Sequence, residues 1–337
     1  MFRIFKALIF LGFLSAATLG TGLWWYANRA IPLNTGNVDF TVAPGSSMRA
    51  AARAAAGVMP VHADVLVLLA RILGRETRIK AGSYEIEPGT SPLALIDKLT
   101  RGEVTLQELT VPEGWTFRQF RAALDSHSGV HHASAGLSDS ELLAAIVRAE
   151  PGGETRHPEG LFFPDTYLFS SGARDTDVLR RAYRMMKRRL AAEWERRAAG
   201  APYASAYEAL IMASIIEKET GQARERPLIA GVFVNRLRRG MLLQTDPTVI
   251  YGLGQGFDGN LRKRDLQADG PYNTYMRTGL PPTPIALPGL AAIQASLNPA
   301  RTDAVYFVAR GDGTHEFSAS LEAHNRAVNK YQRGRGG

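Results

Sequence analysis

The chain has 337 residues, of which 45% are apolar and 21% are charged. This is the balance of a globular protein, and the length suffices for two ordinary domains. It contains no cysteine, which excludes a disulfide framework, a thiol nucleophile and any cysteine-based zinc site. The formal net charge of +8 indicates an acidic partner, such as nucleic acid, anionic lipid or the acidic peptides of a cell wall.

The N-terminal segment decides among these partners. From Ala7 to Tyr26 there are twenty residues without a charge, and a helix of that length covers roughly 30 Å, the thickness of a bilayer's hydrocarbon core. Arg3 and Lys6 precede this segment and an aromatic cluster closes it. We therefore expect residues 1–30 to hold a single-pass anchor with a cytoplasmic N-terminus. A cleaved signal peptide is the alternative, although no A-x-A site follows.

If the anchor is retained, the remaining chain lies on the outer, periplasmic side of the cytoplasmic (inner) membrane. That location argues against nucleic acid as the partner, despite the positive charge. Anionic lipid and cell-wall material remain. A short Pro- and Gly-containing linker is expected at residues 31–37.

A pattern of strand, turn and helix then occurs three times, starting at Phe40 (FTVAPGSSM), Tyr84 (YEIEPGTSP) and Leu109 (LTVPEGWTF). The Gly at the sixth place permits a positive φ in the turn, and a Ser or Thr caps the helix that follows. With another helix expected over residues 61–73, residues 38–105 form a small α+β module. It resembles LysM-type glycan-binding domains. A spacer that only packs against the next domain is the alternative.

The predicted fold class is α+β: a transmembrane helix, the LysM-like module and a larger α+β catalytic domain. Residues 106–157 are expected to be a connecting βα unit with a polar loop, 158–332 the catalytic domain and 333–337 a tail. The loop contains His127, His131 and His132, but no acidic or histidine partner stands at a helical ligand spacing. A solvated loop is therefore expected there, and no metal site.

Glu217 is the candidate catalytic residue. The segment Tyr207 to Thr220 (YEALIMASIIEKET) is apolar nearly all round before it reaches Glu217, which predicts a buried helix ended by Gly221. Loss of hydration and the negative end of the helix dipole both raise the pKa of such a carboxyl, as a general acid requires. Glu219 is about 200° around the helix and faces away. The alternative for Glu217 is an ordinary glutamate that is exposed or paired with an Arg.

Candidate substrate-binding residues follow in two segments. The first is QTDPTVIYGLG, with Gln244, Asp246 and Tyr251; in it, Thr245 or Asp246 can instead cap a short helix begun by Pro247. The second runs from residue 272 to residue 289 (YNTYMRTGLPPTPIALPG) and contributes Asn273 and Tyr275. Its aromatic faces and amides suit a carbohydrate groove, and its prolines equally suit a rigid connection.

These motifs together resemble the endolytic murein transglycosylase family (MltG or YceG-like proteins). The resemblance is carried by SIIEKET, LQTDPTVIYG, YNTY, GLPPTPI followed by PG, the YFV…H-x-F…HN pattern, and EGLFFPDTY from Glu159 to Tyr167. The motifs occur in the family's order, and the resemblance as a whole covers the anchor, the LysM-like module and the C-terminal region. The polar loop at residues 126–136 departs from the pattern.

By this resemblance, Glu217 is the acid/base of a lytic transglycosylase that cuts the β-1,4 bond between N-acetylmuramic acid and N-acetylglucosamine. The muramic acid C6 hydroxyl attacks C1 and leaves a 1,6-anhydro end, so one carboxyl suffices where ordinary glycosidases use two. The resemblance implies no cofactor. It also implies that the enzyme terminates nascent glycan strands near membrane peptidoglycan synthases.

Two other functions stay open from the sequence. One is a hydrolytic muramidase in which Asp246 or Glu219 directs a water molecule. The other is a non-catalytic membrane scaffold that binds glycan through its LysM-like module and holds synthases.

Overall fold

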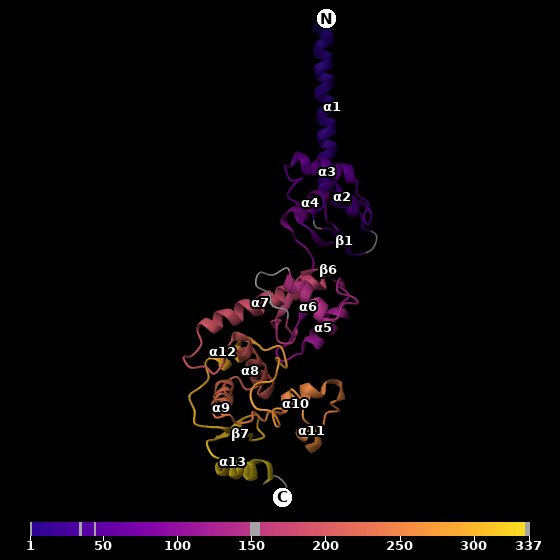
Figure 1. The fold of residues 1–337 in the computed structure, drawn as a ribbon. Coiled ribbons are helices and arrows are strands. Elements are labelled where there is room, and N and C mark those ends of the chain that lie inside the picture. Colours follow the sequence, from indigo (N-terminus) through magenta and orange to yellow (C-terminus); the bar gives the residue numbers. More distant parts are fainter. Residues whose placement is uncertain (1, 34–35, 44, 149–155, 334–337) are drawn as a thin grey trace. The chain divides into compact units, whose positions relative to one another are not determined.

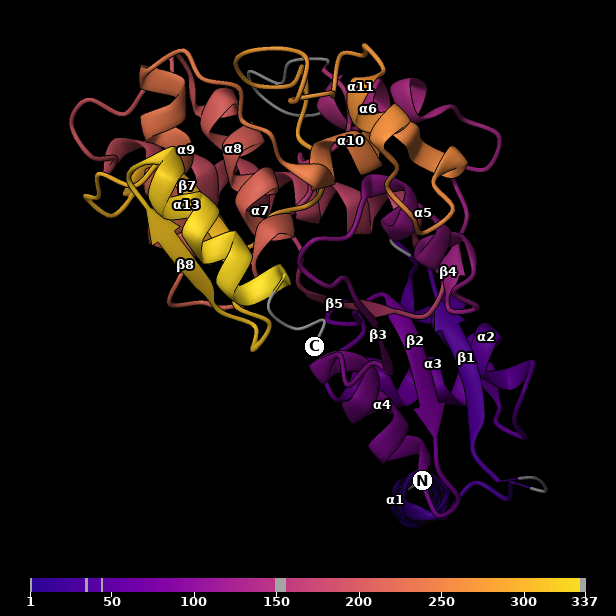
Figure 2. The ribbon, with the colours of Figure 1, turned by 90° about the horizontal axis from the view of Figure 1, so that it is seen from below.

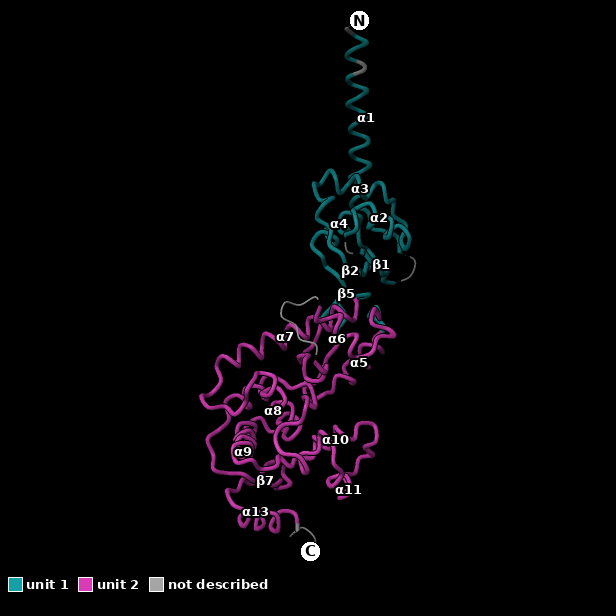
Figure 3. The backbone as a smooth tube through the Cα atoms, viewed as in Figure 1, with its two compact units in different colours: residues 1–108, 128–131, 168–173 teal, residues 109–127, 132–167, 174–337 magenta. Residues whose placement is uncertain are grey.

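The computed structural model describes residues 2–33, 36–43, 45–148 and 156–333. It confirms a mixed α+β fold. The chain divides into two compact units (Figure 3): unit 1 comprises residues 1–108, 128–131 and 168–173, and unit 2 comprises residues 109–127, 132–167 and 174–337. The domain boundaries expected from the sequence stay a prediction, and part of the expected polar loop, residues 149–155, lies outside the described residues.

The first helix of unit 1, α1 (Phe2–Asn28), is apolar, and the chain does not cover its described side chains before its last turns, which begin at Leu23. Its large side chains are exposed along its length, for example Phe10 at 67% and Phe13 at 74%. Among the described residues, only this helix is long and apolar enough to cross a membrane; a signal sequence meets the same criteria. An exposed apolar surface of this kind is compatible with a membrane anchor.

The rest of unit 1 is a two-stranded sheet covered by helices. Strands β1 (Val38–Val42) and β2 (Gly82–Ile86) pair antiparallel, and the core also contains apolar residues of α2 (Met48–Ala56), α3 (Ala63–Ile72) and α4 (Pro92–Arg101). The end of α1 belongs to the same core, and the His62 N–H donates to the Tyr26 hydroxyl at 2.9 Å. This module is α+β as expected; its likeness to LysM domains stays a prediction.

The helix caps predicted from the three repeats are confirmed. Ser47, Ser91 and Thr116 each accept a backbone N–H at the start of the following helix, which satisfies a donor that otherwise lacks a partner. Gly102 ends α4 in the left-handed conformation. Thr116 is part of a full capping box with Gln119, which fixes the start of α5 close to the turn at residues 112–115.

Unit 2 is largely helical, with short strand pairs (Figures 1 and 2). Strands β3 and β5 pair and each runs from one unit into the other. The elements from the third strand onward are β3 (Leu106–Thr110), α5 (Phe117–Asp125), β4 (Val130–His131), α6 (Asp139–Arg148), β5 (Thr166–Ser170), β6 (Ala173–Arg174), α7 (Asp175–Glu195), α8 (Ala206–Glu219), α9 (Arg226–Arg238), α10 (Asp246–Leu253), η1 (Gly254–Gly256), α11 (Lys263–Gln267), α12 (Leu290–Leu297), β7 (Tyr306–Ala309), β8 (His315–Ser318), α13 (Leu321–Val328) and η2 (Asn329–Arg333).

Helix α8 is the centre of unit 2. Every residue from Ala209 to Ile216 is buried, and α8 packs against α12, α9, α7 and α10. Burial all round explains why the helix shows no amphipathic pattern in sequence. Towards the C-terminus, β7 and β8 form an antiparallel hairpin, and α13 follows it.

Two local expectations are wrong. Gly221 does not end α8 in a left-handed conformation; the helix ends at Glu219 because Thr220 is extended. Neither Thr245 nor Asp246 caps α10: Thr245 occupies the N-cap position, but its hydroxyl makes no capping hydrogen bond. The Thr245 hydroxyl and the Asp246 carboxylate make tertiary hydrogen bonds instead, to Glu219 and Tyr275, and a local pattern does not reveal such contacts.

Candidate active site

Glu217 lies in the last turn of α8 with its carboxylate held by two donors. Its side chain is only 5% exposed. Oε1 accepts a hydrogen bond from Nη2 of Arg226 at 3.3 Å, and Oε2 accepts one from the backbone N–H of Gly289 at 2.9 Å. The alternative expected from the sequence, a glutamate paired with an Arg, is therefore present. The pair differs from an ordinary surface ion pair because the Glu217 carboxylate is buried.

The two donors come from segments that α8 itself positions. Arg226 is the first residue of α9, next to Pro227, which is favoured at a helix start. Gly289 ends a segment that runs along α8, where the Ile285 N–H donates to the buried Ser214 hydroxyl at 2.9 Å. Ser214 and Glu217 are three residues apart on one helix, so the segment contacts neighbouring positions of one face.

A second pairing holds the same segment from its other side. The Gly114 N–H donates to the Leu287 carbonyl at 2.9 Å, and the Leu287 N–H donates to the Trp115 carbonyl at 2.6 Å. This pairing places the turn after β3 beside Gly289. The side chain of Glu113 fills the space over the Gly289 Cα, where an added methyl group would overlap its carboxylate.

The pKa of the Glu217 carboxyl is raised above its ordinary value. Burial is the largest cause, and the nearby negative charge of Glu113 acts in the same direction. The Gly289 N–H and the Arg226 guanidinium oppose the rise because they favour the carboxylate. A carboxyl balanced in this way can donate a proton, and its donors then stabilise the resulting anion, which is the requirement for a group that acts first as acid and then as base.

Glu219 has different partners, and its angular offset on α8 directs it away from Glu217. Its Oε2 accepts a hydrogen bond from the Thr245 hydroxyl at 2.7 Å, and burial raises its pKa. Asp246 lies nearby, exposed, and accepts a hydrogen bond from the Tyr275 hydroxyl at 2.5 Å. Two of the predicted binding residues are thus brought together, on the Glu219 side of the helix.

The remaining predicted binding residues are dispersed. Gln244 is exposed and is the only described non-glycine residue with a positive φ, at 50°. Asn273 is buried, and its amide bonds the backbone carbonyls of Asp265, Leu266 and Ala268 and the Tyr275 N–H. Because these contacts use its amide donors and its acceptor, Asn273 shapes the loop in this structure. Tyr251 donates to the buried Glu159 carboxylate at 3.1 Å.

Comparison with known proteins identifies the family. The model of the YceG-like family matches residues 40–330. The chain belongs to the YceG-like family. The endolytic murein transglycosylase of Bacillus subtilis is 36% identical over 265 residues, covering 75% of this chain and 73% of its own length. That of Streptococcus pneumoniae D39 is 30% identical over 288 residues, covering 75% of this chain and 50% of its own length.

A solved structure agrees with the family assignment. The crystal structure of a YceG-like protein from Listeria monocytogenes aligns with a TM-score of 0.55 at 27% sequence identity. The alignment covers 87% of this chain and 99% of the Listeria chain. The likeness therefore extends over nearly the whole of that structure.

Sequence reasoning about this YceG-like protein missed three groups beside Glu217: Glu113, Arg226 and the Gly289 N–H. Two of them stand in motifs that were noted for another reason, Glu113 in a turn repeat and Gly289 in the PG that follows GLPPTPI. Arg226 stands next to the helix-starting proline. The signal that could have found Arg226 is weak, because a single Arg nine residues after a Glu indicates no contact.

Glu159 begins the EGLFFPDTY motif, and the sequence indicates no function for it. Its side chain is buried, and its carboxylate accepts hydrogen bonds from the Phe117 N–H at 2.9 Å and from Tyr251. Burial raises the pKa of Glu159 to about 7. It therefore ties the start of α5 to α10, and both elements adjoin segments that reach the Glu217 site.

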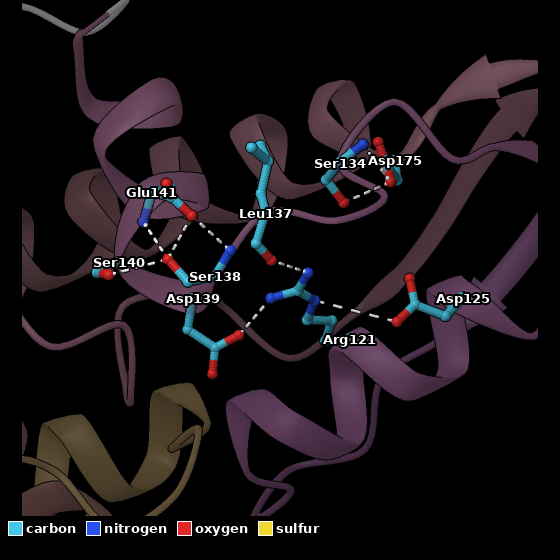
Figure 4. Close-up of polar contacts among 9 residues, drawn as sticks. All are labelled: Arg121, Asp125, Ser134, Leu137, Ser138, Asp139, Ser140, Glu141 and Asp175. Atoms are coloured by element: carbon cyan, nitrogen blue, oxygen red, sulfur yellow. Dashed lines mark hydrogen bonds and ion pairs between the residues drawn. The ribbon is translucent and has the colours of Figure 1, made fainter.

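The histidine loop contains one group with metal-ligand chemistry among the described residues. Ligand atoms of Asp125, His132 and Asp175 all lie within 4.8 Å of one another. Figure 4 shows that Asp175 is engaged by the backbone N–H and hydroxyl of Ser134, at 3.1 and 2.6 Å. These contacts give Asp175 a structural role at the start of α7. Helical spacing could not reveal the group because its members come from separate elements; the absence of a metal site stays a prediction.

The proline-rich loop lines a hollow near the other end of α8. Leu280, Pro281 and Pro282 border it together with Tyr207 and Ile211, and its volume is about 540 Å³. Tyr207 and Ile211 precede Glu217 on α8, so the loop follows the helix from this hollow to Glu217. An aromatic side chain at such a hollow suits contact with a sugar face.

Proposed function

We propose that this chain is an endolytic murein transglycosylase, a lyase that cuts peptidoglycan glycan strands with Glu217 as its acid/base. The observation that carries the proposal is the buried Glu217 carboxyl with a raised pKa and two positioned donors. Family membership supports it, because the relatives in Bacillus subtilis and Streptococcus pneumoniae are named for this activity.

In the proposed reaction, protonated Glu217 donates its proton to the oxygen that links N-acetylmuramic acid to N-acetylglucosamine. As the C1–O bond breaks, the C6 hydroxyl oxygen of the same muramic acid attacks C1, and the Glu217 carboxylate accepts the hydroxyl proton. The products are a 1,6-anhydro end and a free N-acetylglucosamine hydroxyl, and Glu217 is again protonated. Arg226 and the Gly289 N–H stabilise the carboxylate between the two transfers.

The raised pKa gives this cycle a physical basis near neutral pH. An ordinary glutamate is ionised there and cannot act as a general acid. Burial keeps a larger fraction of Glu217 protonated. Its two hydrogen-bond donors, Arg226 and the Gly289 N–H, limit the rise in pKa, so Glu217 can still form a carboxylate. Attack by a hydroxyl of the substrate itself requires no water-directing carboxylate.

The chain is further proposed to act from the outer face of the cytoplasmic membrane. Its support is α1, a largely exposed apolar helix with Arg3 and Lys6 in its first turns, which suits an anchor with a cytoplasmic N-terminus. Residues 38–105 would then present a LysM-like module to the glycan, and residues 158–332 would carry the catalytic domain. Membrane peptidoglycan synthases are the proposed partners, because nascent strands emerge beside them.

Gln244, Asp246, Tyr251, Asn273 and Tyr275 keep a proposed role in binding the strand. The exposed Gln244 and Asp246 are suited to direct contact, whereas Asn273 acts through the loop that it holds. The hollow bordered by Tyr207 is a further candidate contact for the strand, toward the start of α8.

The experiment compares the full-length protein with Glu217→Gln on purified sacculi, with mass spectrometry of the released ends. We expect 1,6-anhydro ends from the unchanged protein and none above background from the variant, which keeps the shape of the side chain. Reducing muramic acid ends would show the hydrolytic muramidase instead. A folded protein that releases no glycan at all would show the scaffold, and unchanged cleavage by Glu217→Gln would remove the Glu217 assignment.

A further inference from the structure

Arg226 is an incompletely paired cation between two carboxylates. Its side chain is only 12% exposed. Nη2 lies 3.3 Å from Oε1 of Glu217 and 4.0 Å from Oε2 of Glu113. Its Nε is buried and finds no hydrogen-bond partner among the described residues. A buried donor without a partner has a free-energy cost of about 1–3 kcal/mol, so the observed arrangement leaves an interaction unmade.

Glu113 is the group best placed to make that interaction. It lies in the turn after β3, and its side chain is 47% exposed, so it can move without displacing the core. The Gly114–Leu287 hydrogen bond holds its backbone, and the absent side chain of Gly289 leaves the space that its carboxylate occupies. Glycine at 289 therefore serves two purposes: its N–H binds Glu217 and its bare Cα admits Glu113.

We propose that Glu113 is a positioning residue of the transglycosylase reaction, one that draws Arg226 away from Glu217 while Glu217 carries the proton. The inference rests on the proposed function of Glu217. It concerns which carboxylate holds the guanidinium at each stage of the cycle. Nothing in the motif that contains Glu113 indicates this from sequence, where the residue occupies a turn.

The physical reason is that the two stages need opposite surroundings. As an acid, Glu217 must be neutral, and a guanidinium bound to it opposes protonation. As a carboxylate, it needs that same cation. A shift of Arg226 toward Glu113 replaces the single 3.3 Å hydrogen bond by a two-nitrogen pair that also satisfies Nε. When the proton leaves Glu217, its new charge draws the guanidinium back.

The other charged and polar groups at this position leave Glu113 as the available partner. Lys218, on α8, is exposed, and its Nζ donates to the Gly114 carbonyl at 3.3 Å. From the segment before α12, the Gly289 N–H faces Glu217. Helix α9 contributes Arg226, and the turn after β3 contributes Glu113. The charges of these two side chains are the ones that affect the pKa of Glu217.

The test measures kcat/KM against pH for release of anhydro-ended glycan by the full-length protein. The variants are Glu113→Gln and Glu113→Asp, with Glu322→Gln as a matched control because Glu322 also pairs with an Arg but lies exposed on α13. For Glu113→Gln we expect about a tenfold loss at neutral pH, the consequence of a pKa change of about one unit in the acid. The basic limb of the profile should move to lower pH, because Arg226 then binds only Glu217.

Glu113→Asp keeps the charge and should recover most of the activity, with a basic limb close to that of the unchanged protein. A purely structural role for Glu113 lowers the melting temperature but leaves the limb in place, and that result overturns the proposal. So does a Glu113→Gln profile that coincides with that of Glu322→Gln. Failure of the proposed function is recognised separately, since the unchanged protein then releases no anhydro ends at all.

Discussion

Glu217 and Glu219 are two residues apart on one helix and have different surroundings. Burial raises the pKa of both. Glu217 accepts hydrogen bonds from a guanidinium and a backbone N–H, whereas Glu219 accepts one from the neutral Thr245 hydroxyl. Desolvation alone therefore does not distinguish the two carboxyls.

The difference lies in what each site can stabilise after losing a proton. Arg226 and the Gly289 N–H favour a carboxylate at 217, so that residue can alternate between two protonation states. Glu219 accepts a hydrogen bond only from a hydroxyl among its described contacts; the nearby negative charge of Asp246 raises its pKa further, while His315 and Arg236 lower it without a hydrogen bond to the carboxylate. Its geometry suits a structural carboxyl that links α8 to the start of α10. The proposed chemistry thus depends on the partners contributed by other elements.

The largest expected effect separates the two glutamates directly. Glu217→Gln should lower glycan cleavage by roughly 10²- to 10⁴-fold, the usual contribution of a general acid. Glu219→Gln keeps the shape and can still accept from Thr245, so its activity should stay within about tenfold of the unchanged protein. Release of anhydro-ended muropeptides measures both. Equal losses in the two variants would contradict the distinction between the two sides of α8.

Removal of the Arg226 guanidinium should change how cleavage depends on pH, because Arg226 bonds Glu217 and not Glu219. In Arg226→Gln, burial and Glu113 still raise the pKa of Glu217, and the opposing guanidinium is gone. The pKa should therefore rise further, and the basic limb of the kcat/KM profile should move to higher pH, opposite to the expectation for Glu113→Gln. The maximal rate should fall because the carboxylate state loses a stabilising charge. A limb that moves to lower pH would contradict the assigned sign.

The same raised pKa has a consequence for stability. A carboxyl whose pKa is higher in the folded than in the unfolded protein contributes stability that is complete below the unfolded pKa and is lost as pH rises through the folded one. Arg226→Gln should therefore lose stability more steeply toward neutral pH than the unchanged protein. Thermal melting at several pH values, with Arg326→Gln on the exposed surface as a control, measures the difference.

A smaller effect is expected when Ser214 is replaced, because its hydroxyl holds the segment that leads to Gly289. Ser214→Ala removes the acceptor of the buried Ile285 N–H and should lower the free energy of unfolding by about 1–3 kcal/mol, the cost of a buried donor without a partner. Cleavage should also fall, since that segment carries Gly289. Denaturant unfolding with activity measured in parallel tests both. A stability loss with full activity would show that the segment keeps its place without Ser214.

The smallest effect is expected on the Glu219 side. Tyr275→Phe removes the hydrogen bond to the exposed Asp246, which should cost no more than about 1 kcal/mol of stability. If Tyr275 contacts the strand, KM should rise while kcat changes little. Steady-state kinetics on glycan strands of defined length distinguish a change in KM from a change in kcat. A large fall in kcat with unchanged KM would place Tyr275 in the chemistry and weaken the contrast with Glu217.

The features predicted correctly from sequence depend on neighbouring residues. The apolar helix before residue 29, the Ser and Thr caps of three helices and the buried character of α8 all follow from short spacings or continuous composition. The expected Thr245 cap failed because its hydroxyl bonds Glu219 instead, and the expected stop at Gly221 failed because Thr220 leaves the helical conformation one residue earlier. Local preferences are worth about 1 kcal/mol, and packing overrides them.

Sequence by itself thus determined that Glu217 lies near the end of a buried apolar helix and that its pKa should rise, because both conclusions need only the residues of α8. The tertiary structure decided what surrounds the carboxyl. Arg226 begins α9, Gly289 precedes α12 and Glu113 follows β3. They meet because α8 packs against α9 and α12, and because the turn after β3 lies beside the last turn of α8. Contacts between residues up to 176 positions apart, as Glu113 and Gly289 are, leave no periodic trace in the chain.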